Sequence, residues 1–271
     1  MGQDKAQDSA SDDLPYADLT YSGGKLRLFV ESPLHAGARI APDEGQAHYL
    51  LHVMRAREGQ RVLLFNGSDG EWQARIAQVS RRSCVLICET QSQAQAAVPD
   101  LWFAFAPIKK TPADYVAQKA TELGVRVLQP VFTHRTITRR VNLDRLRANA
   151  VEAAEQSQRL SVPEIREPVG LDVLLRSWPA ERRLLFCDEG GDAAPVAEAL
   201  QQAAAGNMSW GILIGPEGGF DAQERAAIRN HPFVLAVSLG PRIMRADTAA
   251  LAALAVWQAI RGDWGQSRPG L

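Results

Sequence analysis

Short alternations of apolar and polar residues fill the first third of the chain. They predict strands at residues 26–30, 61–65, 72–79 and 84–89. Asn66–Gly70 is typical of a hairpin turn between the second and third of these strands. One helix is expected over residues 45–55. So many short strands within about 70 residues indicate a small barrel, which we place at residues 25–92.

Beyond a linker at residues 91–99, the apolar positions form continuous runs that alternate with amphipathic stretches. The runs predict strands at 101–108, 125–132, 184–187, 210–214 and 234–239. The amphipathic stretches predict helices at 112–123, 143–159 and 195–205. This alternation is typical of an α/β domain with a mostly parallel sheet and helices on both faces, here over residues 100–271.

Two ends of the chain depart from these patterns. Residues 1–24 are polar and acidic and lack the basic and apolar regions of a signal peptide, so a disordered tail is expected there. The last predicted helix, 249–260, is apolar almost all round and should be buried on nearly all sides. Such a surface at the chain end predicts a homodimer interface.

Composition excludes several classes of protein. A hydrophobic content of 46% and a charged content of 23% are normal for a soluble globular protein, and no apolar run reaches the roughly 20 residues of a membrane span. The net charge of −1 does not suit a generic polyanion binder. Cys84, Cys88 and Cys187 have no disulfide or metal spacing, which favours a reduced, cytoplasmic setting. The five histidines also lack ligand spacing, so no metal is expected.

Two glycine loops are the strongest chemical signal. Residues 215–220 (GPEGGF) and 240–245 (GPRIMR) each follow a predicted buried strand and precede a helix. This arrangement brings backbone N–H groups to a ligand at the carboxyl edge of a parallel sheet, so one shared pocket is expected. Asp221 with Glu224 predicts a capping box, and Asp247 or Thr248 is expected to cap the final helix.

Glu217 restricts the ligand of the first loop. Its carboxylate would repel a pyrophosphate, and the Gly-x-Gly-x-x-Gly spacing is absent, which disfavours a dinucleotide-dependent oxidoreductase. A carboxylate at this position suits a cation, a ribose hydroxyl or an adenine amino group. A noncatalytic RNA-binding assembly factor is the other alternative, in which both loops are structural remnants.

Four segments resemble one family in sequence and in order. They are QKATELGV (118–125), EQSQRLSVPEI (155–165), ILIGPEGGF (212–220) and LGPRIMRADTAAL (239–251), preceded by Arg27-Leu28-Phe29. The combination resembles the RsmE family of SPOUT-superfamily methyltransferases, which methylate uridine N3 in small-subunit (16S) ribosomal RNA. The resemblance implies a PUA-like N-terminal β-barrel, a trefoil-knotted C-terminal domain, S-adenosylmethionine as methyl donor and a homodimer. Periodicity alone would have excluded a knot, because knots are rare.

The resemblance also implies a set of site residues. S-adenosylmethionine is a sulfonium cation without phosphate, which agrees with a glutamate in the first loop. The residues expected to bind the cofactor are Asp188, Glu189, Leu213, Gly215, Glu217, Gly218, Gly219, Leu239, Gly240, Arg242, Ile243, Met244 and Thr248. The expected RNA partner is ribosomal RNA in an assembled small ribosomal subunit. The residues expected to bind it are Arg27, Arg55, Lys110, Gln156 and Arg159.

Methylation of uridine N3 requires removal of a proton and stabilisation of the resulting negative charge on the ring. Arg245 is the candidate for charge stabilisation, because a guanidinium offers several fixed donors. Asp247 is a weaker candidate for the general base. The chain departs from the family at two positions: Asp247 replaces the usual glutamate, and Gln158 stands where a glycine is common.

Overall fold

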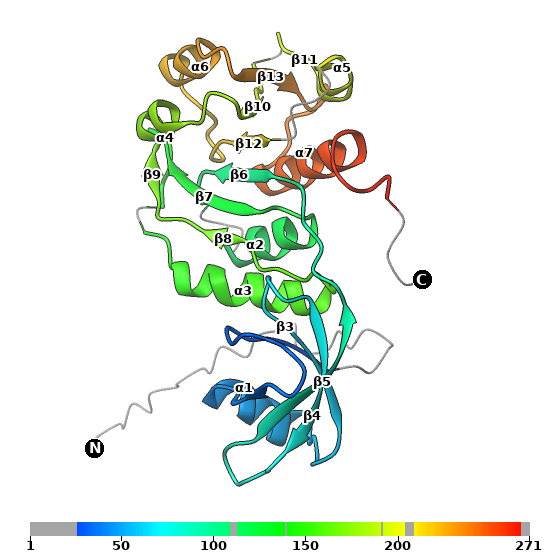
Figure 1. Cartoon of the computed structure of the whole chain (residues 1–271). Helices are drawn as coiled ribbons and strands as arrows, with labels where there is room; N and C mark the ends of the chain where they lie inside the picture. The colour runs from blue at the N-terminus through cyan, green and yellow to red at the C-terminus, as the bar shows by residue number, and fades with distance from the viewer. Residues whose placement is uncertain (1–25, 109–112, 139, 191, 204–208, 267–271) are drawn as a thin grey trace, which may run out of the picture.

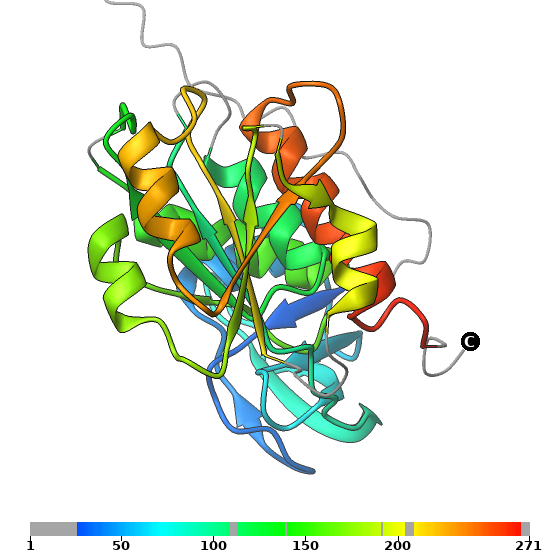
Figure 2. The same cartoon turned by 90° about the horizontal axis from the view of Figure 1, so that it is seen from above.

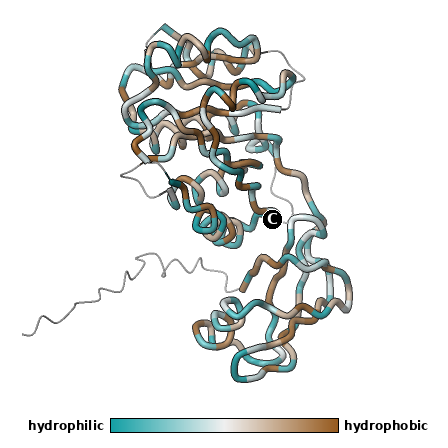
Figure 3. Tube along the Cα trace, turned by 90° about the vertical axis from the view of Figure 1, so that its left-hand side faces the viewer, coloured by the Kyte–Doolittle hydropathy of each residue, from teal (hydrophilic) through white to brown (hydrophobic). Residues whose placement is uncertain are grey.

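The computed structural model describes residues 26–108, 113–138, 140–190, 192–203 and 209–266. The expected tail and Lys110 lie outside these residues. The chain forms two bodies that a single extended connection joins, with hydrophobic stretches running through the strands of both (Figure 3). None of the helices within the described ranges is both long enough and apolar enough to cross a bilayer.

The N-terminal body is a curled five-stranded sheet, in the order β1-β3-β4-β5-β2, at the bottom of Figure 1. Its strands are β1 (Arg27–Phe29), β2 (Arg39–Ile40), β3 (Arg61–Phe65), β4 (Glu71–Ala77) and β5 (Val85–Gln93). The predicted hairpin joins β3 to β4, which pair antiparallel. Because β5 continues to Gln93 and pairs with β4, the first three residues of the predicted linker belong to the sheet.

The helix predicted in this body is split into two kinds of turn. The α-helix α1 (Glu44–His48) opens on a capping box at Asp43, and a π-helical segment, η1 (Tyr49–Val53), follows it directly. Leu50 of η1 is fully buried in the core of the curled sheet. Burial of this one residue anchors the segment, while Val53 and Met54 remain exposed.

The C-terminal body contains a parallel sheet in the order β11-β13-β10-β12-β6-β7-β8, and β9 also pairs with β7. Its strands are β6 (Leu101–Phe105), β7 (Val127–Phe132), β8 (Glu164–Ile165), β9 (Val169–Gly170), β10 (Arg183–Cys187), β11 (Ala194–Pro195), β12 (Trp210–Ile214) and β13 (Val234–Ser238). All the recorded pairings are parallel, as predicted.

Helices cover both faces of this sheet, which confirms the predicted layers (Figure 2). Side chains from α2 (Ala113–Glu122), α3 (Leu143–Gln156), α5 (Val196–Gln202) and α7 (Ala246–Ile260) share one core with Phe103. Those of α4 (Leu171–Ser177) and α6 (Ala222–Arg229) share a second core with Ala104. Adjacent residues of β6 enter different cores because side chains alternate between the faces of a strand.

The final helix is less buried in the single chain than its composition predicts. Ala250, Ala253, Leu254 and Trp257 face the sheet and are buried, whereas Ala252 and Ala255 on the other side are only half-buried. The expected cap is also wrong. Helix α7 begins at Ala246 with Arg245 as the N-cap residue, so Asp247 lies inside the first turn, where its charge still suits the helix dipole.

A buried arginine joins the two bodies. The Nε of Arg27 in β1 donates to Glu71 at 2.6 Å, and its Nη1 and Nη2 donate to the carbonyl groups of Ala154 and Arg159 at 2.6 and 2.7 Å. The guanidinium also lies 3.8 Å from the centre of the Phe65 ring. All three guanidinium nitrogens therefore donate within the protein, and β1 is fixed against the end of α3.

Candidate active site

Three strand ends meet at one edge of the parallel sheet. Strand β10 lies between β12 and β13, and its Phe186 and Cys187 are in register with Leu213 and Val237. The segments that follow these strands, which begin at Asp188, Gly215 and Leu239, therefore leave the sheet side by side. The structure thus brings together the two glycine loops and the end of β10, where open α/β sheets bind ligands.

Close packing explains two glycines of the first loop. A Cβ atom at Gly215 would lie 2.6 Å from the ring of Phe220, a buried side chain that packs edge-on against Phe186. Gly219 has a φ of +67°, and a Cβ there would overlap the carboxylate of Glu189. Glu217 and Gly218 are exposed between them. The backbone of this loop is therefore held by its own sheet while its tip faces outward.

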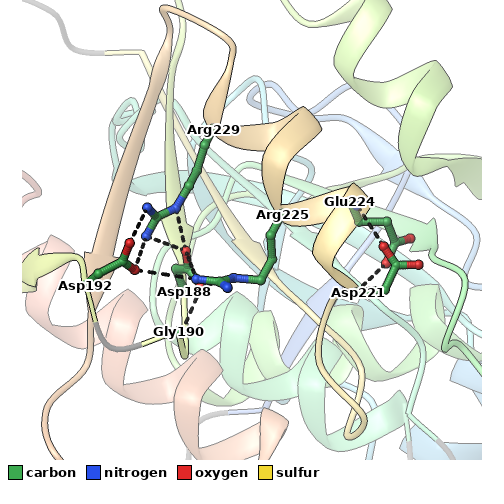
Figure 4. Close-up of polar contacts among 7 residues, drawn as sticks. All are labelled: Asp188, Gly190, Asp192, Asp221, Glu224, Arg225 and Arg229. Atoms are coloured by element: carbon green, nitrogen blue, oxygen red, sulfur yellow. Dashed lines mark hydrogen bonds and ion pairs between the residues drawn. The ribbon is translucent and has the colours of Figure 1, made fainter.

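Two of the expected cofactor residues have side chains committed elsewhere. Leu213 is fully buried in the core beneath α4 and α6. The carboxylate of Asp188 is buried and accepts hydrogen bonds from Arg225 at 2.8 Å and from Arg229 at 2.7 Å (Figure 4). Burial by itself would raise the pKa of Asp188, but hydrogen bonds from Arg225 and Gly190 outweigh it and hold the pKa below its usual value. Neither side chain is therefore free to bind a ligand.

The second loop stands away from the rest of the chain. Gly240 has a φ of +111° with open space around its Cα, and Ile243 is 91% exposed. Arg242 and Arg245 are also exposed. The side chains of Arg242, Ile243 and Arg245 are therefore open to solvent in the single chain.

A third loop takes part that sequence reasoning missed. The residues after β7 cross to the first loop: the backbone N–H of His134 donates to Glu224 at 2.8 Å, and Arg135 donates to the carbonyl group of Gly218 at 2.7 Å. His134 Nδ1 lies 2.6 Å from Asp221, and this hydrogen bond raises the pKa of His134. A sequence signal existed, because Thr133-His134-Arg135 is a polar segment at the carboxyl end of a parallel strand.

Asp221 and Glu224 form the predicted capping box of α6, which is confirmed. Together with His134 they place three potential metal ligands within 4.8 Å of one another. Their oxygen atoms already accept backbone hydrogen bonds that fix the helix start. We therefore assign them to the structure of the loop and not to a metal.

The expected RNA-binding residues separate into three groups. Arg27 is buried between the two bodies, so its predicted contact with RNA is wrong and its role is structural. Arg159 donates to the carbonyl group of Thr121 at 3.0 Å, and burial lowers its pKa to about 10, so it also serves the fold. Arg55 and Gln156 are exposed and available to a partner.

Comparisons with known proteins agree with this architecture. Residues 95–258 match the family model of an RNA methyltransferase domain, and residues 42–88 match that of an RNA methyltransferase PUA domain. The chain belongs to the RNA methyltransferase family. This confirms the predicted PUA-like and methyltransferase parts of the fold.

Individual members of the RNA methyltransferase family match over most of their length. The ribosomal RNA small subunit methyltransferase E of Rickettsia conorii is 29% identical over 230 residues, which cover 84% of this chain and 93% of the relative. The protein of the same name from Bacillus subtilis is 28% identical over 236 residues, covering 80% and 90%.

Solved structures give the same result. Methyltransferase E from Neisseria gonorrhoeae, bound to S-adenosylmethionine, has a TM-score of 0.79 and 26% identity, with 89% of this chain and 99% of that chain covered. A putative methyltransferase from Legionella pneumophila, in complex with the same cofactor, has a TM-score of 0.78 and 27% identity, with 88% and 99% covered. The trefoil knot implied by the resemblance stays a prediction.

Proposed function

We propose that this RNA methyltransferase transfers the methyl group of S-adenosylmethionine to N3 of a uridine in small-subunit ribosomal RNA. The observation that carries the proposal is the convergence of two glycine loops and the end of β10 at one edge of a parallel sheet. The same fold holds this cofactor in the relatives from N. gonorrhoeae and L. pneumophila. The relatives from R. conorii and B. subtilis are ribosomal RNA small subunit methyltransferases, which supports ribosomal RNA as the substrate.

The residues present fit the cofactor. A Cβ atom at Gly215 or Gly219 would overlap Phe220 or Glu189, so glycine at both positions lets these side chains pack against the loop and fix its backbone beside the end of β10. Glu217 places a carboxylate at the exposed tip of the loop, which suits a cationic sulfonium ligand and not a phosphate. When bound, the cofactor would supply an electrophilic methyl group. The Gly215 and Gly240 loops would hold it, mainly through backbone groups.

Arg245 and Asp247 are our candidates for the chemistry. Both lie at the start of α7, directly after the Gly240 loop, and Arg245 is exposed toward any substrate there. The guanidinium would stabilise the negative charge that develops on the uracil carbonyl oxygens as N3 loses its proton. Asp247 would accept that proton or orient the loop. Its side chain is one methylene shorter than the family's usual glutamate.

The proposal also includes the oligomeric state of the enzyme and the form of its RNA substrate. We infer a homodimer through the half-buried side of α7. Leu251, Ala252 and Ala255 lie within about one helical turn of one another there, and none belongs to the sheet core. The target uridine would be presented by an assembled small subunit in the cytoplasm. A near-neutral protein gains little from general attraction to RNA, so the shape of the particle would supply recognition.

The test is mass spectrometry of small-subunit ribosomal RNA from cells that lack the gene. We expect N3-methyluridine to disappear and to return with the wild-type gene. Purified Arg245→Ala should still bind S-adenosylmethionine and subunits, but its turnover should fall by about 10²-fold or more. N3-methyluridine that persists at full level in the deletion strain would overturn the proposal.

Binding experiments with the purified wild-type protein distinguish the alternative functions. Calorimetry with S-adenosylmethionine and with NAD distinguishes a methyltransferase from an oxidoreductase. Subunit binding without consumption of S-adenosylmethionine would identify a noncatalytic assembly factor.

A further inference from the structure

The turn after β7 contacts the first glycine loop and also lines a cavity. On the loop side, the Arg135 side chain passes over Gly218, because a Cβ atom built on that glycine would lie 3.5 Å from Arg135 Cδ. Its Nη1 then donates to the Gly218 carbonyl group at 2.7 Å. The two contacts from His134 to the capping box of α6 add to this brace. Residues 134 and 135 thus hold the loop from its tip to the helix that follows.

A half-open cavity beside the same turn has a volume of about 480 Å³. It is lined by Phe132, Thr133, His134, Thr136 and Thr138. The N–H group of Thr133 donates to Thr136 Oγ1 at 2.9 Å, and the two hydroxyl oxygens are also 2.9 Å apart, so the turn has a fixed shape. The volume is within the range of about 300–1,000 Å³ for small-molecule pockets.

We propose that this cavity receives an unpaired nucleotide of the substrate RNA and that the turn 133–138 couples its occupancy to the cofactor loop. The inference rests on the proposed function. The hydroxyl groups and the imidazole of the lining suit the polar edges of a base and a ribose, whereas an apolar ligand would prefer a more hydrophobic lining. Arg140, two residues beyond Thr138, is exposed and would face the phosphates. Only an unstacked nucleotide could enter, as expected for an enzyme that acts on a ring nitrogen.

Coupling follows from the position of His134. It lines the cavity and also holds Asp221 and Glu224, so a ligand in the cavity contacts the group that fixes the start of α6. Because coupling between two sites is reciprocal, RNA should tighten cofactor binding by the same factor as the cofactor tightens RNA binding. Arg135 acts on the same loop through its hydrogen bond to the Gly218 carbonyl group, so it is a positioning residue and not a catalytic one.

The first experiment fills the cavity. Thr138→Trp places a large ring at a lining position, whereas Ile137→Trp places the same ring at a neighbouring side chain that is 63% exposed and does not line the cavity. The substrate is small subunits isolated from the deletion strain. We expect Thr138→Trp to raise KM for subunits at least tenfold with an unchanged Kd for S-adenosylmethionine alone, and Ile137→Trp to resemble the wild type.

Two outcomes would overturn the cavity assignment: a wild-type KM in Thr138→Trp, or an equal rise of KM in both variants. Thr138→Ala keeps the test informative if the tryptophan variant does not fold. It enlarges the cavity and removes one hydroxyl, so the KM for subunits should rise by a smaller factor. An unchanged KM in this variant would then count against the proposal.

The second experiment measures coupling by binding, without turnover. The Kd for S-adenosylmethionine is determined with and without saturating subunits for the wild type, Arg135→Ala and Arg135→Lys. We expect RNA to tighten cofactor binding at least fivefold in the wild type, not at all in Arg135→Ala, and partly in Arg135→Lys, whose ammonium can still donate toward Gly218. Equal coupling in the wild type and Arg135→Ala would overturn the proposal.

The two proposals fail in different ways. If the wild type binds subunits and S-adenosylmethionine but forms no N3-methyluridine, the proposed function fails. If the wild type methylates while Thr138→Trp and Arg135→Ala behave like it, only the inference about the cavity and the turn fails.

Discussion

At the scale of single residues, Gln158 adopts the left-handed backbone conformation that usually favours glycine. Helix α3 ends with Ser157 as its C-cap, and the next residue, Gln158, has a φ of +60°. The N–H group of Arg159 donates to the carbonyl group of Ala154, which is the bond pattern of a Schellman motif. The glycine that is common in the family at this position therefore has a structural reason, and this chain has a strained residue there.

We predict that Gln158→Gly is more stable than Gln158→Ala. Both variants lose the same side-chain contacts, but only glycine relieves the left-handed conformation. After the extra entropy of glycine in the unfolded chain is subtracted, the difference should be about 0.5 to 1 kcal/mol. Urea unfolding of both variants measures it. An alanine variant as stable as the glycine variant would show that the backbone is not strained at this position.

Neighbouring glycines of the first loop should respond differently to the same substitution. A Cβ atom at Gly219 meets the Glu189 carboxylate and a φ of +67°, whereas at Gly218 it makes ordinary contacts of 3.5 and 3.6 Å with Arg135. We expect Gly219→Ala to weaken binding of S-adenosylmethionine at least tenfold and Gly218→Ala to weaken it much less. Calorimetry on both folded variants decides this. The reverse order would mean that the ligand approaches the loop at Gly218.

Among the elements, helix α3 connects the two bodies through a titrating group. Glu155 is partly buried, and its Oε1 accepts a hydrogen bond from the backbone N–H of Phe29 in β1 at 2.9 Å. Burial raises the pKa of Glu155 from 4.5 to about 7 despite that hydrogen bond and the nearby Arg27. The contact between the two bodies therefore contains a carboxyl group that changes charge near neutral pH.

This shift predicts a pH dependence of stability. The folded protein holds the Glu155 proton more tightly than the unfolded chain, so its contribution is complete below pH 4.5 and is lost as the pH rises toward about 7. Glu155→Gln keeps an oxygen acceptor for Phe29 and cannot ionise. We expect this variant to be more stable than the wild type at pH 8 and nearly equal at pH 4.5, by thermal unfolding across this range.

Glu152→Gln is the matched control for that experiment, because Glu152 is an exposed carboxylate on the same helix. Its charge is the smallest of the causes that shift the pKa of Glu155, so the stability of this variant should stay close to the wild-type pH profile. If Glu152→Gln and Glu155→Gln change the profile equally, the effect belongs to general charge and not to the contact with β1.

For the whole molecule, the structure identifies the residues of α7 that can test the homodimer. Ala253 and Leu254 pack against the sheet, so a glutamate at either position would disrupt the core of the single chain. Ala252 and Ala255 lie on the half-buried side of α7. We expect Ala252→Glu and Ala255→Glu to give folded monomers by sedimentation, with weakened cofactor binding if the second chain covers the Gly240 loop. A monomeric wild type at micromolar concentration would contradict the dimer.

The sequence by itself determined the features that depend on neighbours along the chain. Periodicity located β3 and β12 to the residue, and the Asp221–Glu224 spacing gave the capping box, because these signals arise within a few residues. The strand-loop-helix order was also enough to predict that the Gly215 and Gly240 loops leave the same edge of the sheet. Parallel strands place all their carboxyl ends at one edge, whatever their order.

Only the tertiary structure decided which partner each polar side chain finds. Arg27 looked like a solvent-facing cation, but its guanidinium is buried against Glu71 and the end of α3, 127 residues away at Ala154. Asp188 is taken by Arg225 and Arg229, and Arg135 reaches the loop at Gly218. Charge and hydrogen-bonding capacity are properties of a residue, whereas burial and pairing depend on which distant elements the fold packs against it.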